Sequence, residues 1–549
     1  MQKYLGKFVT VTFDDSRSVL DVIDQACNTY NELPAFTCMG KTLSYAELDK
    51  YSRDFAVFLQ HCDHLQPGDR IAVQMPNILQ YPIVMFGVMR AGMILVNTNP
   101  LYTARELKHQ LCDSGAKMLV VLANLAASAA EIVDQTPVEQ VVVTELGDMH
   151  GPIKRLLINQ VVRLKKMVPK HSFTHQVSFR SALAKGESLQ WLPVKREPQD
   201  VAVLQYTGGT TGVAKGAMLT HRNLVCNMVQ VRNQFDGYLR IAQECYMAPL
   251  PLYHIYAFTL HCMALIATGN HSILVPNPRD LDSLTAAMKA QKVTGFVGLN
   301  TLFNSLCAHQ KFQRLDFSHL QLTASGGMAL TSEAAVLWKK ITGCEVSEGY
   351  GLTETSPVVS CNVPGKAQQG TVGTPVIYTE VKVTDQDGKT QPAGERGLLW
   401  VRGPQVMKGY WQNPEATAEV IDGEGWFNTG DVAIIQADGY IRIVDRVKDI
   451  IIVSGFNVYP NEVEEVLSQC PGVREAAVIG IKDAHSGEVV KAFVVLNDKS
   501  VTVEAIMDYC HHNLTGYKRP KHIEFRDELP KSNVGKILRR ELKESQPAA

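Results

Sequence analysis

One glycine- and threonine-rich loop contains the residue types that handle phosphate. The string YTGGTTGVAKG begins at Tyr206, directly after the apolar run VAVLQ at 201–205. Glycines let the backbone approach an anion closely, threonine hydroxyls donate hydrogen bonds, and a lysine supplies positive charge. We therefore expect nucleotide contacts from this loop, made by Thr207, Gly208, Gly209, Thr210, Thr211, Gly212 and Lys215.

The loop does not have the sequence of a P-loop. That motif places serine or threonine directly after its glycine-lysine pair, where a helix begins. Here Gly216 and Ala217 follow Lys215, which argues against a Walker-type motor or kinase. Because short glycine-rich motifs have many chance matches, a plain surface loop is the alternative interpretation when the loop is considered alone.

Further motifs follow the loop in chain order. They are PLYHIYAFT at 251–259, SGGMAL at 325–330, EGYGLTETSP at 348–357, FNTGD at 427–431, DRVKDIIIVSGFNVYPNEVE at 445–464 and PKSNVGKILRREL at 530–542. Together with the loop, they resemble the adenylate-forming superfamily of acyl-CoA synthetases, luciferases and peptide-synthetase adenylation domains. Ordered matches across the chain are far more specific than one loop.

The segments between these motifs, such as MPNILQYPIVMFGVMRAGMILVNTNPLYTARELKHQL at 75–111, resemble the bacterial long-chain fatty-acid CoA ligases. The resemblance implies that ATP, a fatty acid and coenzyme A give acyl-CoA, AMP and pyrophosphate through an acyl-adenylate, with Mg²⁺ as cofactor. A ligase for medium-chain or aromatic acids and a fatty acyl-AMP ligase are the alternatives within the superfamily. A nucleotide-binding protein without ligase activity is the alternative outside it.

The motif at 348–357 suits an adenine ring and a metal ion. Its glycines leave a flat surface, Tyr350 can stack on the ring, and Glu354 offers a hard oxygen ligand for Mg²⁺. By resemblance, Thr210 and Glu354 contact the metal and take part in catalysis. The resemblance also implies nucleotide contacts from Gly327, Met328, Glu348, Gly349, Tyr350, Gly351 and Thr353.

Charged residues complete the expected nucleotide site. Asp431 can accept hydrogen bonds from both ribose hydroxyls, and Arg446 resembles a second contact to ribose or phosphate. The resemblance makes Lys536 the catalytic lysine, which bridges the substrate carboxylate and the α-phosphate of the nucleotide. A positioned ammonium there offsets the negative charge that builds up as the two anions meet.

The resemblance also assigns residues to the binding of the acyl group and of coenzyme A. His254 is expected to act at the reacting carboxylate, and Phe258 to gate the acyl tunnel, with a plain core aromatic as the alternative for Phe258. The C-terminal domain is expected to rotate about Lys448 between the two half-reactions. Ser454 and Gly455 would then line the coenzyme A channel, because a residue without a side chain permits close passage.

Three kinds of element must position these residues. Short apolar runs such as MLVVL at 118–122 alternate with helical patterns, which predicts an α/β fold with buried strands. After about residue 375 short strands and Gly/Asp-rich turns predict a β-rich subdomain, and past Asp445 a compact α+β unit follows. We expect an N-terminal adenylate-forming domain at 1–445 and a small, mobile C-terminal domain at 446–549.

The composition gives no reason to expect a nucleic-acid partner, because 54 Lys and Arg balance 55 Asp and Glu. The N-terminal segment lacks a signal-peptide core, since Asp14 and Asp15 interrupt its apolar stretch. A cytoplasmic protein that binds small-molecule substrates is therefore expected. For the oligomeric state, a homodimer is one alternative.

One segment bears on membranes. In GPIKRLLINQVVRLKKMVPKH at 151–171, a helical projection places apolar residues on one side and lysines and arginines on the other. Such basic amphipathic helices can lie on anionic lipid surfaces. Peripheral contact with the cytoplasmic face of the inner membrane is one interpretation, and an ordinary surface helix is the other.

Overall fold

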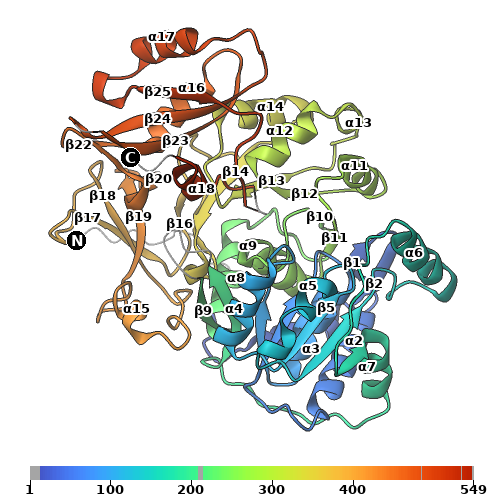
Figure 1. Ribbon diagram of the computed structural model, residues 1–549. Helices are drawn as coiled ribbons and strands as arrows, with labels where there is room; N and C mark the ends of the chain where they lie inside the picture. The colour runs from blue at the N-terminus through green and yellow to red at the C-terminus, as the bar shows by residue number, and fades with distance from the viewer. Residues whose placement is uncertain (1–12, 208–213, 484, 533–534, 547–549) are drawn as a thin grey trace.

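The computed structural model describes residues 13–207, 214–483, 485–532 and 535–546, and within these ranges the strands form four sheets (Figure 1). Two large sheets with their helices make up the first two-thirds of the chain. A four-stranded antiparallel sheet and a smaller α+β unit follow. The predicted fold class, an α/β protein with a large N-terminal and a smaller C-terminal part, is confirmed.

The first large sheet is parallel except for one hairpin, β8–β9. Two of its central strands, β4 and β5, are buried along their whole length, which is why continuous apolar runs replace alternation in the sequence. The strands, in spatial order, are β7 (Gln176–Ser178), β6 (Gln140–Thr144), β5 (Met118–Leu122), β3 (Arg70–Gln74), β4 (Ile94–Asn97), β8 (Val201–Thr207) and β9 (Lys215–Thr220).

The second large sheet has a parallel centre and antiparallel pairs at both edges. Its strands, in spatial order, are β16 (Thr374–Pro375), β15 (Val358–Cys361), β14 (Val346–Gly351), β13 (Leu322–Gly326), β12 (Gly295–Gly298), β10 (Cys245–Ala248), β11 (His271–Leu274), β1 (Pro34–Cys38) and β2 (Lys41–Ser44). The carboxyl ends of β13 and β14 carry the SGGMAL and EGYG motifs, so the parallel pairing brings these motifs side by side.

Helix α8 (His221–Gln234) connects the two large sheets, because it contacts β9 of one and β15 of the other. A capping box starts it: Thr220 Oγ1 accepts from the backbone N of Asn223, whose side-chain oxygen accepts from Thr220 in return. The other main helices of this region are α1 (Val19–Thr29), α2 (Tyr45–Gln60), α3 (Gln80–Arg90), α4 (Ala104–Ser114), α6 (Pro152–Leu164), α7 (Phe179–Glu187), α11 (Leu281–Lys289), α12 (Asn300–Ala308) and α14 (Ser332–Thr342).

The four-stranded sheet is antiparallel and follows the nine-stranded sheet in the chain. Its strands are β17 (Glu380–Thr384), β18 (Arg396–Arg402), β19 (Phe427–Ile435) and β20 (Ile441–Arg446). Gly439, at a φ of 89°, lies in the tight turn between β19 and β20, where only glycine adopts such a backbone without strain. This turn pairs Asp431 of β19 with Arg446 of β20.

The C-terminal unit has a five-stranded sheet and a hydrophobic core of its own. A short 3-10 helix, η4 (Val447–Asp449), joins it to β20. The division of the chain at 445/446 stays a prediction. The elements of the unit are β21 (Ile451–Val453), β22 (Phe456–Val458), α16 (Pro460–Ser468), β23 (Val473–Asp483), β24 (Gly487–Leu496), α17 (Val503–Asn513), β25 (His522–Phe525) and α18 (Arg539–Glu544).

Candidate active site

The last residue pair of the β8–β9 hairpin is the first part of the candidate site. Thr207 and Lys215, which flank the glycine- and threonine-rich segment in the sequence, face each other as the last pair of this hairpin. Most residues expected to contact phosphate lie outside the described residues. They are Gly208, Gly209, Thr210, Thr211 and Gly212.

A second group is centred on Asp431, which is 2% exposed. Tyr350 of β14 donates its hydroxyl to Oδ2 of Asp431, and Nε of Arg446 lies 3.0 Å from Oδ1. The three residues come from two different sheets, yet the carboxylate joins them. The sequence suggested a stacking ring for Tyr350 and did not predict its bond to Asp431. That bond fixes the ring relative to the carboxylate expected to bind ribose.

Lys536 lies close enough to this group to respond to its charges. Burial and, next, the neighbouring Arg446 lower the pKa of Lys536 to about 8, while Asp431 acts in the opposite direction. The lysine follows Gly535, which turns the chain at a φ of 78°. The structure therefore brings together the predicted residues Asp431, Arg446 and Lys536, which are far apart in the sequence.

Glu354 lies on the 3-10 helix η3 (Thr353–Thr355), directly after β14. Its Oε1 accepts a hydrogen bond from the hydroxyl of Tyr410 at 2.8 Å, and burial raises its pKa. The ammonium of Lys215 lies 5.1 Å from the centre of the Tyr410 ring. Tyr410 therefore connects the base of the hairpin with the carboxylate proposed as metal ligand, a role that no motif in the sequence indicated.

Glu348, Gly349, Tyr350 and Gly351 are consecutive on β14. Oε1 of Glu348 accepts a hydrogen bond from the backbone N of Leu330 at 2.9 Å, and burial raises the pKa of Glu348 to about 7. This bond holds the turn after β13, where Gly327 has a φ of 87° and Met328 packs on the core. In this arrangement Glu348 positions the expected adenine wall.

His254 precedes the short helix α9 (Ile255–Ala257). Its Nδ1 accepts a hydrogen bond from the backbone N of Tyr256 at 3.3 Å, so the neutral ring carries its proton on Nε2. Burial and then the charge of Lys536 lower the pKa of His254 to about 4. The imidazole is thus neutral at pH 7 and close to Lys536, and its Nε2–H can donate a hydrogen bond.

Phe258 begins a π-helical segment, η2 (Phe258–Ala264), and is 0% exposed. It belongs to the main hydrophobic core. Both interpretations given above, a core aromatic and a gate to an acyl tunnel, place this ring inside the protein. The gating role stays a prediction.

The residues expected at the hinge and at the coenzyme A channel lie in the link to the C-terminal unit and in its first hairpin. Lys448 is the central residue of η4. Ser454 and Gly455 form the turn between β21 and β22, with φ angles of 49° and 83°. A Cβ atom added to Gly455 would have no neighbour within 4 Å, so the backbone is open to a ligand at this point.

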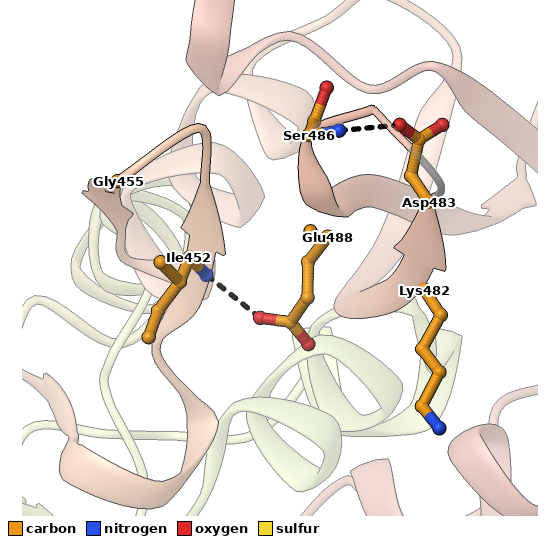
Figure 2. Close-up of a pocket in the computed structure, with 7 residues that line it drawn as sticks. Ile452, Gly455, Lys482, Asp483, Ser486 and Glu488 are labelled. Atoms are coloured by element: carbon orange, nitrogen blue, oxygen red, sulfur yellow. Dashed lines mark hydrogen bonds between the residues drawn. The ribbon is translucent and has the colours of Figure 1, made fainter.

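A cavity of about 840 Å³ lies beside this turn. Figure 2 shows Ile452 and Gly455 on one side of it and Lys482, Asp483 and Ser486 on the other, with the side chain of Glu488 between them. Glu488 accepts a hydrogen bond from the backbone N of Ile452 at 2.8 Å, and the Asp483 side chain accepts one from Ser486 at 2.9 Å. These bonds hold the carboxylates of Glu488 and Asp483 in place beside this open cavity.

Two family models match the chain. The model for AMP-binding enzymes covers residues 23–411, and the model for the C-terminal domain of AMP-binding enzymes covers residues 462–536. Among solved structures, ATP-bound MatB from Rhodopseudomonas palustris superposes with a TM-score of 0.80 at 28% identity, over 96% of this chain and 99% of that one. The anthranilate CoA ligase AuaEII in complex with anthranoyl-AMP gives 0.84 at 25% identity, over 97% and 98%.

Similar relatives include two enzymes named long-chain-fatty-acid–CoA ligase. The one from Escherichia coli O6:H1 is 49% identical and the one from Haemophilus influenzae 47% identical, each over 97% of this chain and 95% of the relative. A feruloyl-CoA synthase from an Amycolatopsis species is 35% identical over 92% and 94%. With a family model spanning residues 23–411 and relatives of this similarity over nearly its whole length, the chain belongs to the AMP-binding enzyme family.

Proposed function

We propose that this chain is a long-chain-fatty-acid–CoA ligase, which converts a fatty acid, ATP and coenzyme A into acyl-CoA, AMP and pyrophosphate. The observation that carries the proposal is the 47% to 49% identity, over 97% of the chain, to enzymes of that name. The grouping of Asp431, Arg446 and Lys536 supports it.

In the first half-reaction, a carboxylate oxygen of the fatty acid attacks the α-phosphorus of ATP. The bond from that phosphorus to the bridging oxygen breaks, and pyrophosphate leaves. Lys536 and Arg446 supply positive charge where the two anions meet, and Asp431 holds the ribose. The Nε2–H of His254 is proposed to donate a hydrogen bond to the reacting carboxylate.

Glu354 and Thr210 are proposed to hold Mg²⁺. Glu354 fits this role because its carboxylate is an oxygen ligand of the kind Mg²⁺ prefers, and because a bound cation would offset the burial that raises its pKa. Bound Mg²⁺ would neutralise phosphate charge during the attack. Tyr410 orients the carboxylate through its hydroxyl.

In the second half-reaction, the sulfur of coenzyme A attacks the carbonyl carbon of the acyl-adenylate, and the bond to the AMP oxygen breaks. Lys536 occupies the site where the first step occurs, so the C-terminal unit is proposed to rotate about Lys448 before the second. The rotation would bring Ser454 and Gly455 to the pantetheine chain, and the open backbone at Gly455 supports this assignment.

The proposal is tested by measuring pyrophosphate release from ATP with acids of increasing chain length, with and without coenzyme A. We expect acid-dependent release that is greatest with long acyl chains, and acyl-CoA only when coenzyme A is present. Absence of acid-dependent release would contradict a ligase of any kind. A maximum with medium-chain or aromatic acids would identify one alternative ligase, and an acyl-adenylate that coenzyme A does not consume would identify a fatty acyl-AMP ligase.

Helix α6 favours an anionic lipid surface as a further partner. The helix ends at Leu164, so the amphipathic segment is shorter than the 151–171 region expected from the sequence. Figure 1 shows α6 at the outer edge of the molecule, beside β1 and β2. Most of its apolar side chains point outward, with Ile153 79% exposed and Leu164 80% exposed, although Val162 is buried; an ordinary surface helix buries such a face.

The charges around α6 complement anionic lipid. Residues 151–171 contain Lys154, Arg155, Arg163, Lys165, Lys166 and Lys170 and no acidic residue. Lys154 is bonded to the backbone O of Met39, and Arg163 pairs with Glu145. We propose that α6 lies on the membrane surface with its leucines in the acyl region. No helix within the described residues is long and apolar enough to cross a bilayer.

Leu157→Glu combined with Leu164→Glu should reduce binding to vesicles that contain phosphatidylglycerol by at least roughly tenfold, because two apolar side chains no longer enter the lipid. Vesicle sedimentation measures this. Val336→Glu is the matched control, since Val336 is 63% exposed on α14, and it should bind as the unaltered protein does. Equal vesicle binding by the unaltered protein and both variants would contradict the proposal. If the unaltered protein has twice the monomer mass in solution without vesicles, and the double variant has the monomer mass, α6 is instead the interface of a homodimer.

A further inference from the structure

A buried hydrogen-bond network connects the end of β20 with α16 and α18. Asp445, near the end of β20, is 1% exposed. Its Oδ2 accepts a hydrogen bond from the backbone N of Asn461 at 2.8 Å, and its Oδ1 lies 3.8 Å from Nη1 of Arg539. Since a buried carboxylate without partners is costly, these contacts hold Asp445 and its partners in one arrangement.

The side chain of Asn461 bonds in two directions. Its Nδ2 donates to the backbone O of Val444 at 3.1 Å, and its Oδ1 accepts from Nη2 of Arg539 at 2.6 Å. Asn461 is the second residue of α16, so its backbone N is one of the N–H groups that a helix leaves unpaired at its start. One residue thus joins the last strand of the four-stranded sheet to the C-terminal unit.

Arg539 is the first residue of α18 and follows Lys536 closely in the chain. Its guanidinium bonds both carboxylate oxygens of Glu464, at 3.1 and 2.7 Å, and Oδ2 of Asp449 at 3.3 Å. Through Arg539, the segment that carries Lys536 is fixed to α16. The position of Lys536 relative to the nucleotide site therefore depends on how α16 is attached to β20.

We propose that Asp445, Asn461 and Arg539 form a latch that stabilises the arrangement with Lys536 in the nucleotide site, and that the latch sets the balance between the two half-reactions. The inference rests on the proposed ligase function and on rotation about Lys448. Because Lys448 lies between Asp445 and Asn461 in the chain, such a rotation moves α16 away from β20.

The latch has a part that breaks and a part that persists. The hydrogen bonds from Asn461 to Val444 and Asp445 cross the rotation point, so rotation requires their loss. The bonds from Arg539 to Asn461 and Glu464 lie on one side of that point and can survive it. These three residues are positioning residues, because they act on the reaction through the placement of Lys536.

Asn461→Ala tests the latch, because it removes the bond to Val444 and frees Arg539. Each half-reaction is measured alone: the first as acid-dependent exchange of pyrophosphate into ATP, the second as thioester formation from supplied acyl-adenylate. The rate of each half-reaction is proportional to the population of the domain arrangement in which that half-reaction takes place. Loss of the hydrogen bond to Val444 should therefore raise the ratio of the second rate to the first about fivefold, the net effect of one hydrogen bond. This expectation holds whichever of the two arrangements predominates. A change limited to stability would lower both rates together.

Asp445→Asn gives an independent second variant, with similar volume and no charge to attract Arg539, and it should shift the ratio in the same direction. Asn513→Ala is the matched control: Asn513 is exposed on α17, and its side-chain amide donates to the backbone O of Tyr509 in the same helix. An unchanged ratio in both latch variants, or an equal shift in the control, would overturn the latch. Failure of pyrophosphate exchange in the unaltered chain would instead contradict the proposed function.

Discussion

Lys536→Ala should strongly reduce acyl-adenylate formation while thioester formation from supplied acyl-adenylate continues at nearly the normal rate. In the present arrangement Lys536 lies with Arg446 and Asp431, where the fatty-acid carboxylate and the α-phosphate are proposed to meet. Loss of one positioned donor from such a site costs about 3 to 4 kcal/mol, a decrease of roughly 10² to 10³ in the rate. The second step is proposed to take place after Lys536 has left, so it should not need the ammonium.

The control for this variant is Lys543→Ala, which removes an exposed lysine from α18 without touching the site. It should leave both half-reactions unchanged. Pyrophosphate exchange and thioester formation are measured separately for each variant. If Lys536→Ala lowers both half-reactions equally, the lysine does not have the assigned role.

The pH dependence of the first half-reaction provides a second measurement on the same lysine. Its pKa is lowered to about 8, so the ammonium is present below that pH and is lost as the pH rises through it. The kcat/KM for pyrophosphate exchange, which reports the free enzyme, should therefore fall above about pH 8. Lys536→Arg keeps its charge at these pH values, so any activity it retains should not show this fall.

Much of the candidate site could be predicted because its residues lie in short motifs. Glu348 to Glu354 occupy one strand and the turn after it, so their proximity follows from the local sequence. The grouping of Asp431, Arg446 and Lys536 was expected only from the resemblance to known enzymes. In the structure it arises from the β19–β20 register and from the latch at α16, which no pattern along the chain encodes.

Contacts that depend on the tertiary fold could not be predicted. Tyr410 lies in a segment between β18 and β19 that no motif marks, yet it bonds Glu354 because a bridge pairs it with Ala217 of β9. Similarly, the periodicity of α6 showed two faces but not which one the protein covers. A pattern of apolar residues indicates a stripe, and only the neighbouring elements decide whether it is buried.

The link between β20 and the C-terminal unit is short, and a substitution in this link is the second change that we expect to have a large effect. Lys448→Pro should leave acyl-adenylate formation largely intact and slow thioester formation by roughly a hundredfold. Proline fixes φ near −65°, a value that matches the 3-10 geometry of η4 in the present arrangement. A rotation that needs another φ at this residue would then cost about 3 kcal/mol, which corresponds to that factor in rate.

Lys448→Ala is the matched control, because it removes the same side chain but keeps the backbone free, and it should support both half-reactions. Proline also disfavours a helical backbone at Val447, so thermal unfolding of both variants is compared to detect strain in η4. Normal first-step activity with slow thioester formation in the proline variant alone would locate the rotation at this residue. If thioester formation is unchanged in the proline variant, the φ angle of Lys448 does not change between the two half-reactions. In that case no rotation at Lys448 breaks the hydrogen bonds from Asn461 to β20.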